Sequence, residues 1–340
     1  MPNYSVDILN NIRLNASEEY AARIPAATQE NIATIGQYFQ TYTPLFNEFC
    51  DNLLNKIGKT IIDQKMFKNP LSRFKSGAVS PHDIEEIFVG MAKAEGKYDP
   101  KGPNPLGRRD AVPVEVTYHR ENRQDYYAIS MGDIDFIRVF RSPATLEVFI
   151  KGQINAVYSA DEYDEYLAMK NVLATFPNKE KTGLGYFDYE VKDMSKAPSK
   201  EAFARDFVKT LRKAVKDVQF HSTKYNAAGV FTASKPGDLV LLVHKDVTTE
   251  VDVELLAKAF HTSNTDMKVV PTIVELDDFG TMTDTYGLLV DAEWFRIFDT
   301  LQTMKKQENA QGLFTNYFYH HHQILSASPF KTAVRLKRVN

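Results

Sequence analysis

The chain has little of what marks a secreted disulfide protein, a zinc protein or a membrane protein. Cys50 is its only cysteine, so no disulfide and no cysteine-based zinc site can form within one copy. The longest purely aliphatic run, residues 239–243, is far shorter than the roughly 20 residues that a membrane-spanning helix needs. The first residues lack the basic region and apolar stretch of a secretory signal. We therefore expect no membrane partner and folding in a reducing cytoplasm.

A charge excess of one sign is also lacking. The 41 basic and 44 acidic side chains give a net charge of −3, whereas tight nucleic-acid binding usually goes with a clear basic excess. Apolar residues make up 43% of the chain, which is ample for a real core. Because 340 residues exceed the usual size of one domain, two lobes or one elaborate domain are expected.

Sequence motifs for phosphate binding, for a serine nucleophile and for calcium binding are incomplete or absent. Residues 58–60 resemble the end of a phosphate-binding loop, but the first glycine of that motif is replaced by Leu53. No Gly-x-Ser-x-Gly sequence occurs. The acidic residues 161–165 lack the glycine and the ligand spacing of a calcium loop, so they favour a solvated or interface face of a helix. We predict no catalytic group and no cofactor.

Three consecutive histidines, residues 320–322, are the strongest candidates for a metal site. Since neighbouring residues of a strand point to opposite faces, at most His320 and His322 could bind one ion. The adjoining sequence offers no carboxylate or thiol that would complete the site, which favours structural or surface histidines. A metal-dependent hydrolase that uses His320 and His322 stays open as an alternative, and bound metal lost on mutating both would support it.

Residues 69–127 do not look like part of a compact enzyme. Six of the fifteen prolines and five of the sixteen glycines lie between residues 69 and 113, where they interrupt regular helix repeatedly. Two short β-capable runs, residues 59–67 and 112–118, flank this stretch. The pattern predicts a long two-stranded arm, and such an arm usually lies on another molecule. It therefore favours assembly over catalysis.

A long helix is predicted over residues 142–176. Ser142 is a plausible N-cap, and Pro143 suits the first helical position. A continuous helix of this length would measure about 50 Å. Residues 159–162 resemble a capping box, so a kink or break near Ser159 stays possible. An apolar stripe runs along the whole segment and comprises Leu146, Phe149, Ile150, Ile154, Val157, Tyr158, Tyr166, Met169, Val172, Leu173 and Phe176.

Helices and strands alternate irregularly in the rest of the chain. The first 57 residues have a mostly helical pattern, with an apolar stripe over residues 44–57. Further helices are predicted at residues 201–218 and 253–260, and strands at 238–244, 269–276, 287–291 and within 313–338. The pattern of residues 294–304 does not decide between helix and strand. Without a regular βαβ alternation, the fold class is predicted to be α+β.

Several segments in the same order resemble the major capsid proteins of phi-29-like podoviruses. They are NPLSRFKSG, DIEEIF, KYD, YHRENRQDYY, INAVYSADEYDEYLAMK, VDVELLAKAFHTSNTDM and LLVDAEWFRIFDTLQTMKKQENAQGLFTNYFYHHHQILSASPF. The resemblance as a whole extends from about residue 47 to residue 330. None is a chemical motif, so the specificity of the match lies in their number and order.

This resemblance implies the tailed-phage major capsid fold, which is Hong Kong 97-like. Residues 1–58 would be the N-terminal arm and helix, and residues 59–132 the extended hairpin called the E-loop with its flanking strands. Residues 133–183 and 300–340 would form the peripheral domain with its spine helix, and residues 184–299 the axial domain.

The resemblance also implies a structural protein of the virion. Copies would self-assemble through pentamers and hexamers into an icosahedral or prolate phage head that encloses double-stranded DNA. The implied partners are a scaffolding protein, the portal and the packaged DNA, which would be bound non-specifically on the inner face. We name Arg73, Lys75, Arg120 and Arg123 of the arm as candidate contacts between subunits. An encapsulin-type compartment shell, which would contain protein cargo, is the first alternative.

Overall fold

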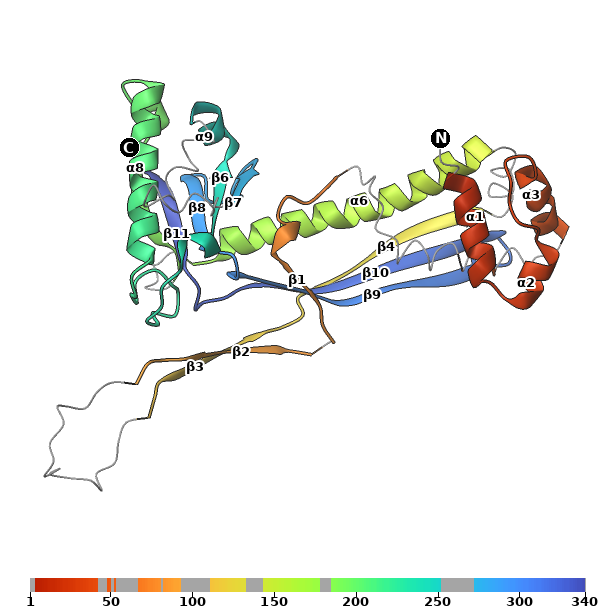
Figure 1. The fold of residues 1–340 in the computed structure, drawn as a ribbon, viewed down its shortest axis with the longest axis horizontal. Coiled ribbons are helices and arrows are strands. Elements are labelled where there is room, and N and C mark those ends of the chain that lie inside the picture. The colour runs from red at the N-terminus through yellow and green to blue at the C-terminus, as the bar shows by residue number, and fades with distance from the viewer. Residues whose placement is uncertain are drawn as a thin grey trace, which may run out of the picture.

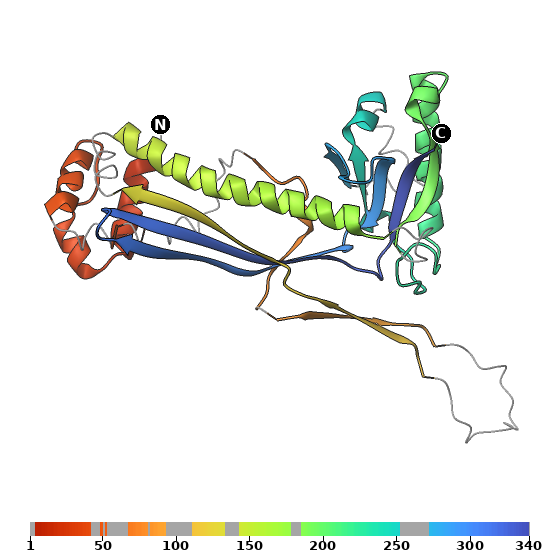
Figure 2. The same cartoon turned by 180° about the vertical axis from the view of Figure 1, so that it is seen from behind.

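The computed structural model describes residues 4–41, 48–49, 52, 67–80, 82–92, 111–132, 143–177, 185–251 and 272–339. Figure 1 shows an elongated molecule in which one long helix, α6, runs beside a long sheet. A compact lobe lies at one end of this pair, a group of short helices lies at the other, and a two-stranded hairpin projects from the middle (Figures 1 and 2). Helices and strands are interleaved without a regular βαβ alternation, and most strand pairs are antiparallel, so the predicted α+β class is confirmed.

Helix α6 spans Pro143–Thr175 without interruption and is 33 residues long. It passes through Ser159 as regular helix, so the break that we considered at this residue is not present. At 1.5 Å per residue the helix measures about 50 Å. Ser142, the predicted N-cap, lies outside the described residues.

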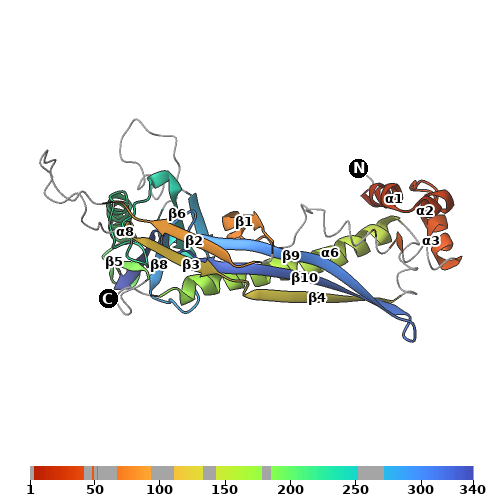
Figure 3. The same ribbon diagram turned by 90° about the horizontal axis from the view of Figure 1, so that it is seen from below.

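The long sheet has the strand order β1-β9-β10-β4. Its strands are β1 (Lys75–Ala78), β9 (Phe295–Asn309), β10 (Phe314–Ala327) and β4 (Arg123–Gly132). Residues 294–304, whose pattern fits both helix and strand, lie almost wholly in strand β9. Over most of β10 every second residue is buried, which is the alternation of a sheet with one covered face. Helix α6 covers that face (Figure 3).

The compact lobe is built on a five-stranded sheet with the order β5-β11-β8-β6-β7. Its strands are β5 (Phe187–Lys192), β6 (Leu239–His244), β7 (Thr272–Leu276), β8 (Thr285–Asp291) and β11 (Ala333–Val339). The apolar stripe of α8 (Lys200–Val218) packs on one face, and the C-terminal part of α6 with Trp294 packs on the other. Both faces are therefore covered, which explains why β8 is buried along its whole length. The short helix α9 (Lys245–Glu250) follows β6.

The last strand differs from its predicted place. Residues 313–338 were expected to return to the part of the molecule that contains the long helix, but only β10 does so. Strand β11 pairs with β5 in parallel and with β8 in antiparallel fashion, so it belongs to the lobe. Val334 and Leu336 are fully buried in the lobe core, and the buried Arg335 pairs with Asp188 of β5. Strand β9 begins at Phe295, before the predicted boundary at residue 300.

The N-terminal part is helical, as predicted, where the structure describes it. The helices are α1 (Tyr4–Asn15), α2 (Glu18–Arg23) and α3 (Ile32–Thr41), and they lie near the start of α6 (Figure 1). Ser17 caps α2 by accepting a hydrogen bond from the Tyr20 amide at 3.2 Å. The predicted strand over residues 59–67, apart from Phe67, and the predicted helix over 253–260 lie outside the described residues, as does nearly all of the stripe over 44–57.

The projecting hairpin consists of β2 (Ile84–Val89) and β3 (Val114–His119), which pair in antiparallel register. It lies apart from the lobe and from the long sheet except at its base (Figures 1 and 2). Residues 67–80, which we call the strap, precede it and include the single turn η1 (Ser72–Phe74) and β1. The predicted two-stranded arm is thus present over residues 84–89 and 114–119.

Candidate assembly surface

The β2–β3 hairpin has two chemically different faces. Its register places Ile84, Glu86 and Phe88 on one face and the alternate residues of β2 on the other. The first face, which we call the inner face, turns toward the body of the molecule. The second, the outer face, consists of Glu85, Ile87, Val89, Val114, Val116 and Tyr118.

The inner face is fixed by a group of hydrogen bonds centred on Glu86. The Arg296 guanidinium donates to Glu86 Oε1 from Nη2 at 2.5 Å and from Nε at 3.2 Å. The Ser328 hydroxyl donates to the same oxygen at 2.9 Å, and His119 Nε2 lies 2.9 Å from Glu86 Oε2. The other ring nitrogen of His119 is 2.7 Å from Ser326 Oγ. The strands of the hairpin are therefore tied to both β9 and the end of β10.

These contacts stabilise the charged form of Glu86. Burial by itself would raise the pKa of this carboxyl, but the hydrogen bonds from His119 and Arg296, with the charge of Arg296, outweigh it. They lower the pKa of Glu86 to about 2. The carboxylate is thus ionised at any pH at which the protein is expected to work.

Further contacts hold the base of the hairpin. Asn122 makes two hydrogen bonds with the backbone of Leu325, each at 2.8 Å, and the Thr300 hydroxyl donates to Glu121. Phe88 stacks on Phe330 with a ring-centroid distance of 5.8 Å. Since polar and apolar contacts both act at this end, the hairpin leaves the body in a defined direction.

The outer face has no such cover among the described residues. Its apolar side chains retain between 43% and 63% of their exposed surface, namely Val116 43%, Val114 55%, Ile87 56%, Tyr118 58% and Val89 63%. Met91 and Val112 extend the same apolar surface toward the tip, at 58% and 39%. A contiguous apolar patch of this kind on a soluble protein marks an interaction surface. A two-stranded ribbon cannot bury a second face on its own.

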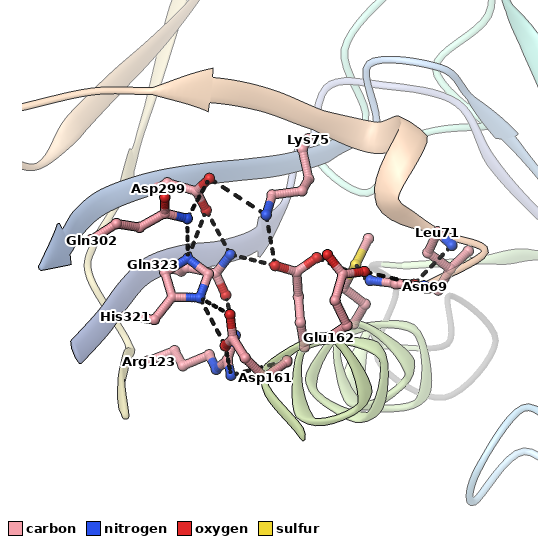
Figure 4. A network of polar contacts seen from close by, with 12 residues as sticks. Asn69, Leu71, Lys75, Arg123, Asp161, Glu162, Asp299, Gln302, His321 and Gln323 are labelled. Atoms are coloured by element: carbon pink, nitrogen blue, oxygen red, sulfur yellow. Dashed lines mark hydrogen bonds and ion pairs between the residues drawn. The ribbon is translucent and has the colours of Figure 1, made fainter. Parts of the chain in front are cut away.

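The strap connects the hairpin to α6 through a separate polar cluster (Figure 4). The Asn69 side chain donates to Glu165 Oε1 at 3.0 Å and also accepts from the Leu71 amide at 2.8 Å. The Lys75 ammonium lies 2.8 Å from Glu165 and 3.4 Å from Asp299 of β9. Movement of the strap would therefore strain contacts on both the helix and the long sheet.

Two of the four predicted contact residues belong to this interior. Arg123 is 6% exposed, and its guanidinium donates to Asp161 at 2.8 Å, Asp125 at 2.6 Å and Gln323 at 2.5 Å. Lys75 is held by its two carboxylates. The charged groups of Lys75 and Arg123 are thus already paired within the chain, which makes both weaker candidates for contacts between subunits than the sequence indicated.

The other two predicted contact residues, Arg73 and Arg120, are exposed. Arg120 forms an ion pair with Asp83 at 3.1 Å in which both side chains are open to solvent, at 75% and 52%. Such a pair contributes little to stability and can exchange partners easily. Both arginines stay candidates for contacts between copies.

His320 and His322 lie on one face of β10, as their spacing predicts. That face is the solvent face, with the two ring centroids 6.4 Å apart, and His322 Nδ1 is 3.4 Å from Glu121. His321 points the other way, toward α6, and is 1% exposed. Sequence reasoning chose the outer pair and missed the buried residue, since alternation alone does not say which set faces inward.

A different trio brings metal-ligand types together. Within the part of the chain that the structure describes, ligand atoms of Glu165, Asp299 and His321 lie within 4.8 Å of one another. The Lys75 ammonium and the Gln323 amide already donate to both carboxylates, the amide at 2.7 and 2.6 Å. These donors neutralise the oxygens that a metal would need, so we assign the trio a structural role.

No described helix is long and apolar enough to cross a membrane.

The whole chain matches one family of known proteins. The model of Phi29-like phage major capsid proteins matches residues 9–337. The chain belongs to this family. It is 34% identical to the major capsid protein of Bacillus phage B103 and 32% identical to that of Bacillus phage PZA, in each case over 97% of this chain and 72% of the relative. A third relative, the major capsid protein of Streptococcus phage Cp-1, is 27% identical and is covered over 92% of its length.

Solved phage capsids share the fold of this family member. The capsid structure of Staphylococcus phage Andhra matches with a TM-score of 0.61 at 12% identity, over 83% of this chain and 88% of that one. A chain in a structure of bacteriophage P68 matches with a TM-score of 0.56 at 12% identity, over 82% and 88%. The Hong Kong 97-like prediction is confirmed. The chain is a structural capsid protein of the virion, and the family match favours this role over the encapsulin and hydrolase alternatives.

Proposed function

We propose that this capsid protein forms its shell by laying the outer face of the hairpin onto a neighbouring copy. The observation that carries the proposal is the apolar outer face itself, which is held out from the body by a rigid polar base. Burying it would remove five large apolar side chains from water, which favours the contact by a free energy of about 25 cal/mol per Å2 of apolar surface buried. Repeated in every subunit, one such contact adds up to a stable shell.

The hairpin then corresponds to the E-loop and the lobe to the axial domain. Helix α6 with β4, β9 and β10 corresponds to the peripheral domain, with α6 as its spine helix. Copies assemble through pentamers and hexamers in the host cytoplasm, with a scaffolding protein and a portal, and enclose double-stranded DNA. The protein performs no catalysis in this role. Arg73 and Arg120 contribute exposed charge beside the hairpin contacts.

The test replaces apolar surface on the outer face while keeping the strand propensity of each residue. We expect the triple variant Ile87→Thr, Val114→Thr, Val116→Thr to remain a folded subunit and to lose assembly, as measured by sedimentation and negative-stain microscopy. The matched control, Ile87→Val with Val116→Ile, keeps the face apolar and should form particles. Particles of normal size and yield from the triple variant would refute the role of the outer face.

The contents of the particles test the enclosed partner separately. Particles purified from infected or expressing cells should contain nuclease-protected double-stranded DNA when the packaging components are present. A constant protein cargo without DNA would instead support the compartment alternative. Metal that is bound stoichiometrically and lost on mutating His320 and His322 together would support the hydrolase alternative.

A further inference from the structure

A cluster of charged groups is buried where α6 crosses the long sheet, and the hairpin contact does not use it. It is formed by three acidic and three basic side chains from five elements. We call it the α6 cluster, and its members are Asp161 and Glu165 of α6, Asp299 of β9, His321 of β10, Lys75 of β1 and Arg123 of β4 (Figure 4).

His321 sits between two carboxylates. Its Nδ1 lies 2.8 Å from both carboxylate oxygens of Asp161, and its Nε2 lies 3.1 Å from Asp299 Oδ1. Ionised carboxylates only accept hydrogen bonds, so both ring nitrogens must carry a proton to satisfy this geometry. A neutral imidazole would turn one lone pair toward a carboxylate. The two carboxylate contacts therefore favour the charged imidazolium.

Among these six groups alone, the charges balance only in that state; Asp125, which also pairs with Arg123 at 2.6 Å, is half-exposed and screened by water, and Glu162 lies at the edge of the cluster. Asp161, Glu165 and Asp299 contribute three negative charges, while Lys75 and Arg123 contribute two positive ones. A protonated His321 supplies the third. A neutral ring would leave one excess negative charge among groups that are largely shielded from water, which is costly in a protein interior.

Other groups that face His321 do not change this balance. Gln302 Nε2 of β9 lies 3.1 Å from His321 Nε2. Two N–H groups cannot bond each other, so the protonated ring requires the Gln302 side-chain amide to present its oxygen instead. Gln323 of β10 bridges Glu165 and Asp299 without carrying a charge. Tyr158 of α6 and Tyr319 of β10 line the same region. Burial and the nearby carboxylate of Asp161 raise the pKa of Tyr158 to about 12 and the pKa of Tyr319 further, so both phenols stay neutral. Glu162 acts on Lys75 from the edge.

The titration behaviour of the cluster agrees with its geometry. Burial alone would lower the pKa of His321, but the hydrogen bonds and charges of Asp161 and Asp299 raise it above its ordinary value. Burial likewise would raise the pKa of Asp299, and the contacts with His321, Lys75 and Gln323 lower it to about 2.

We propose that the α6 cluster is a pH-sensitive joint in which the protonated ring of His321 fastens α6 to the long sheet and, through Lys75, to the strap. Loss of the ring proton at alkaline pH loosens all three together. Because the strap leads into the hairpin, the same event frees the base of the assembly arm from α6. The joint is a property of the single subunit and does not depend on how copies pack.

The direction of the effect follows from linkage. His321 has a higher pKa in the folded chain than in the unfolded one, so its contribution to stability is complete below about pH 6.5. That contribution is lost as the pH rises through the folded value. Between the two values, the equilibrium for opening should rise by up to about tenfold per pH unit.

The experiment measures the thermal unfolding midpoint of the full chain, kept as a subunit, from pH 6 to pH 10. The unfolding midpoint of the wild type should fall as the pH rises across this range. The midpoint of His321→Gln should be lower at pH 6 and should change less with pH. Asp299→Asn removes one negative charge, so the cluster balances with a neutral ring and the alkaline loss should shrink. His320→Gln, one position away on the solvent face, is the matched control and should keep the wild-type profile.

The titration of the His321 ring gives an independent reading. In chains labelled with 15N in the histidine rings, its signal should titrate above the ordinary histidine range, and Asp299→Asn should lower that midpoint. Parallel midpoint profiles for the wild type, Asp299→Asn and His321→Gln would overturn the proposal. A ring that titrates at or below about 6.5 would do so as well. If His321→Gln does not fold, Asp299→Asn and the ring titration decide.

Discussion

The lobe and the β2–β3 hairpin use the same kinds of apolar residue in opposite ways. In the lobe, Leu241, Leu288 and Leu289 are completely buried between α8 and the end of α6. In the hairpin, Ile87 and Val89 are more than half exposed. The lobe therefore draws its stability from its own packing, whereas the outer face of the hairpin gains none from the described part of the chain and is free to serve the proposed contact.

The polar contacts show a second difference. The hairpin is anchored mainly through the Glu86 carboxylate, which accepts hydrogen bonds from Arg296 and Ser328 of the body, with further contacts from Asn122 and Phe88. Rigid attachment on one face and exposure on the other is what a docking arm requires, since a loose arm would lose more conformational entropy on binding. The comparison leads to four expectations, given from the largest effect to the smallest.

A cavity in the lobe should have the largest effect on the subunit. Leu241 is fully buried in the central part of the five-stranded sheet, so Leu241→Ala should lower the free energy of unfolding by about 2–5 kcal/mol. Urea unfolding followed by fluorescence measures this. A loss below about 1 kcal/mol would mean that the lobe is packed less tightly than its burial indicates.

Removing the cation at the hairpin base should have an intermediate effect. Arg296→Met leaves Glu86 without its guanidinium partner and should cost about 1–3 kcal/mol, the usual value for hydrogen bonds to a charged group. Hydrogen exchange of the β2 and β3 amides should report it locally. Arg120→Met removes an exposed cation near the same base and should change exchange by much less. Equal effects of the two variants would contradict the anchoring role of Arg296.

Acid should loosen the hairpin before it disturbs the lobe. Glu86 has a pKa of about 2 in the folded chain, below its ordinary value of 4.5. Its contribution is therefore present above about pH 4.5 and is lost as the pH falls toward 2. Exchange of hairpin amides relative to those of β6 should increase over that window. In Glu86→Gln, which cannot ionise, this pH dependence should be absent; if it persists, another group controls the base.

Trimming the outer face should hardly affect the subunit. Ile87→Ala removes a side chain that is 56% exposed and should change the free energy of unfolding by less than about 0.5 kcal/mol. Its effect should appear in the yield of particles instead. A large loss of subunit stability would mean that the outer face is covered within the chain.

Much of the fold follows from local sequence patterns. The apolar stripe and the length of the segment gave α6 correctly, and the stripe of α8 and the aliphatic run of β6 were equally clear. The arm over residues 69–127 was predicted because its prolines and glycines interrupt regular helix. Segments with mixed patterns were not decided: β9 begins with buried residues and ends almost wholly exposed, so its periodicity changes along its length.

The site was only partly predictable. Arg73 and Arg120 stay exposed as expected, but Arg123 is buried by Asp161, which is 38 residues away in the chain. A local pattern contains no information about such a pairing. The outer face of the hairpin could have been suspected from the alternation in VEVTY, yet alternation fits equally well with a face that the chain covers itself.

The sequence by itself determined the long helix, the interrupted arm, the α+β class and, through many segments in order, the family. It determined that His320 and His322 share one face of a strand and that His321 takes the other. Only the tertiary structure decided which face is buried, because that depends on Asp161 of α6 and Asp299 of β9 meeting across the sheet. Likewise, only the tertiary structure decided which face of the hairpin is fixed to the body. The other stays exposed, since two strands have two faces and the body covers one.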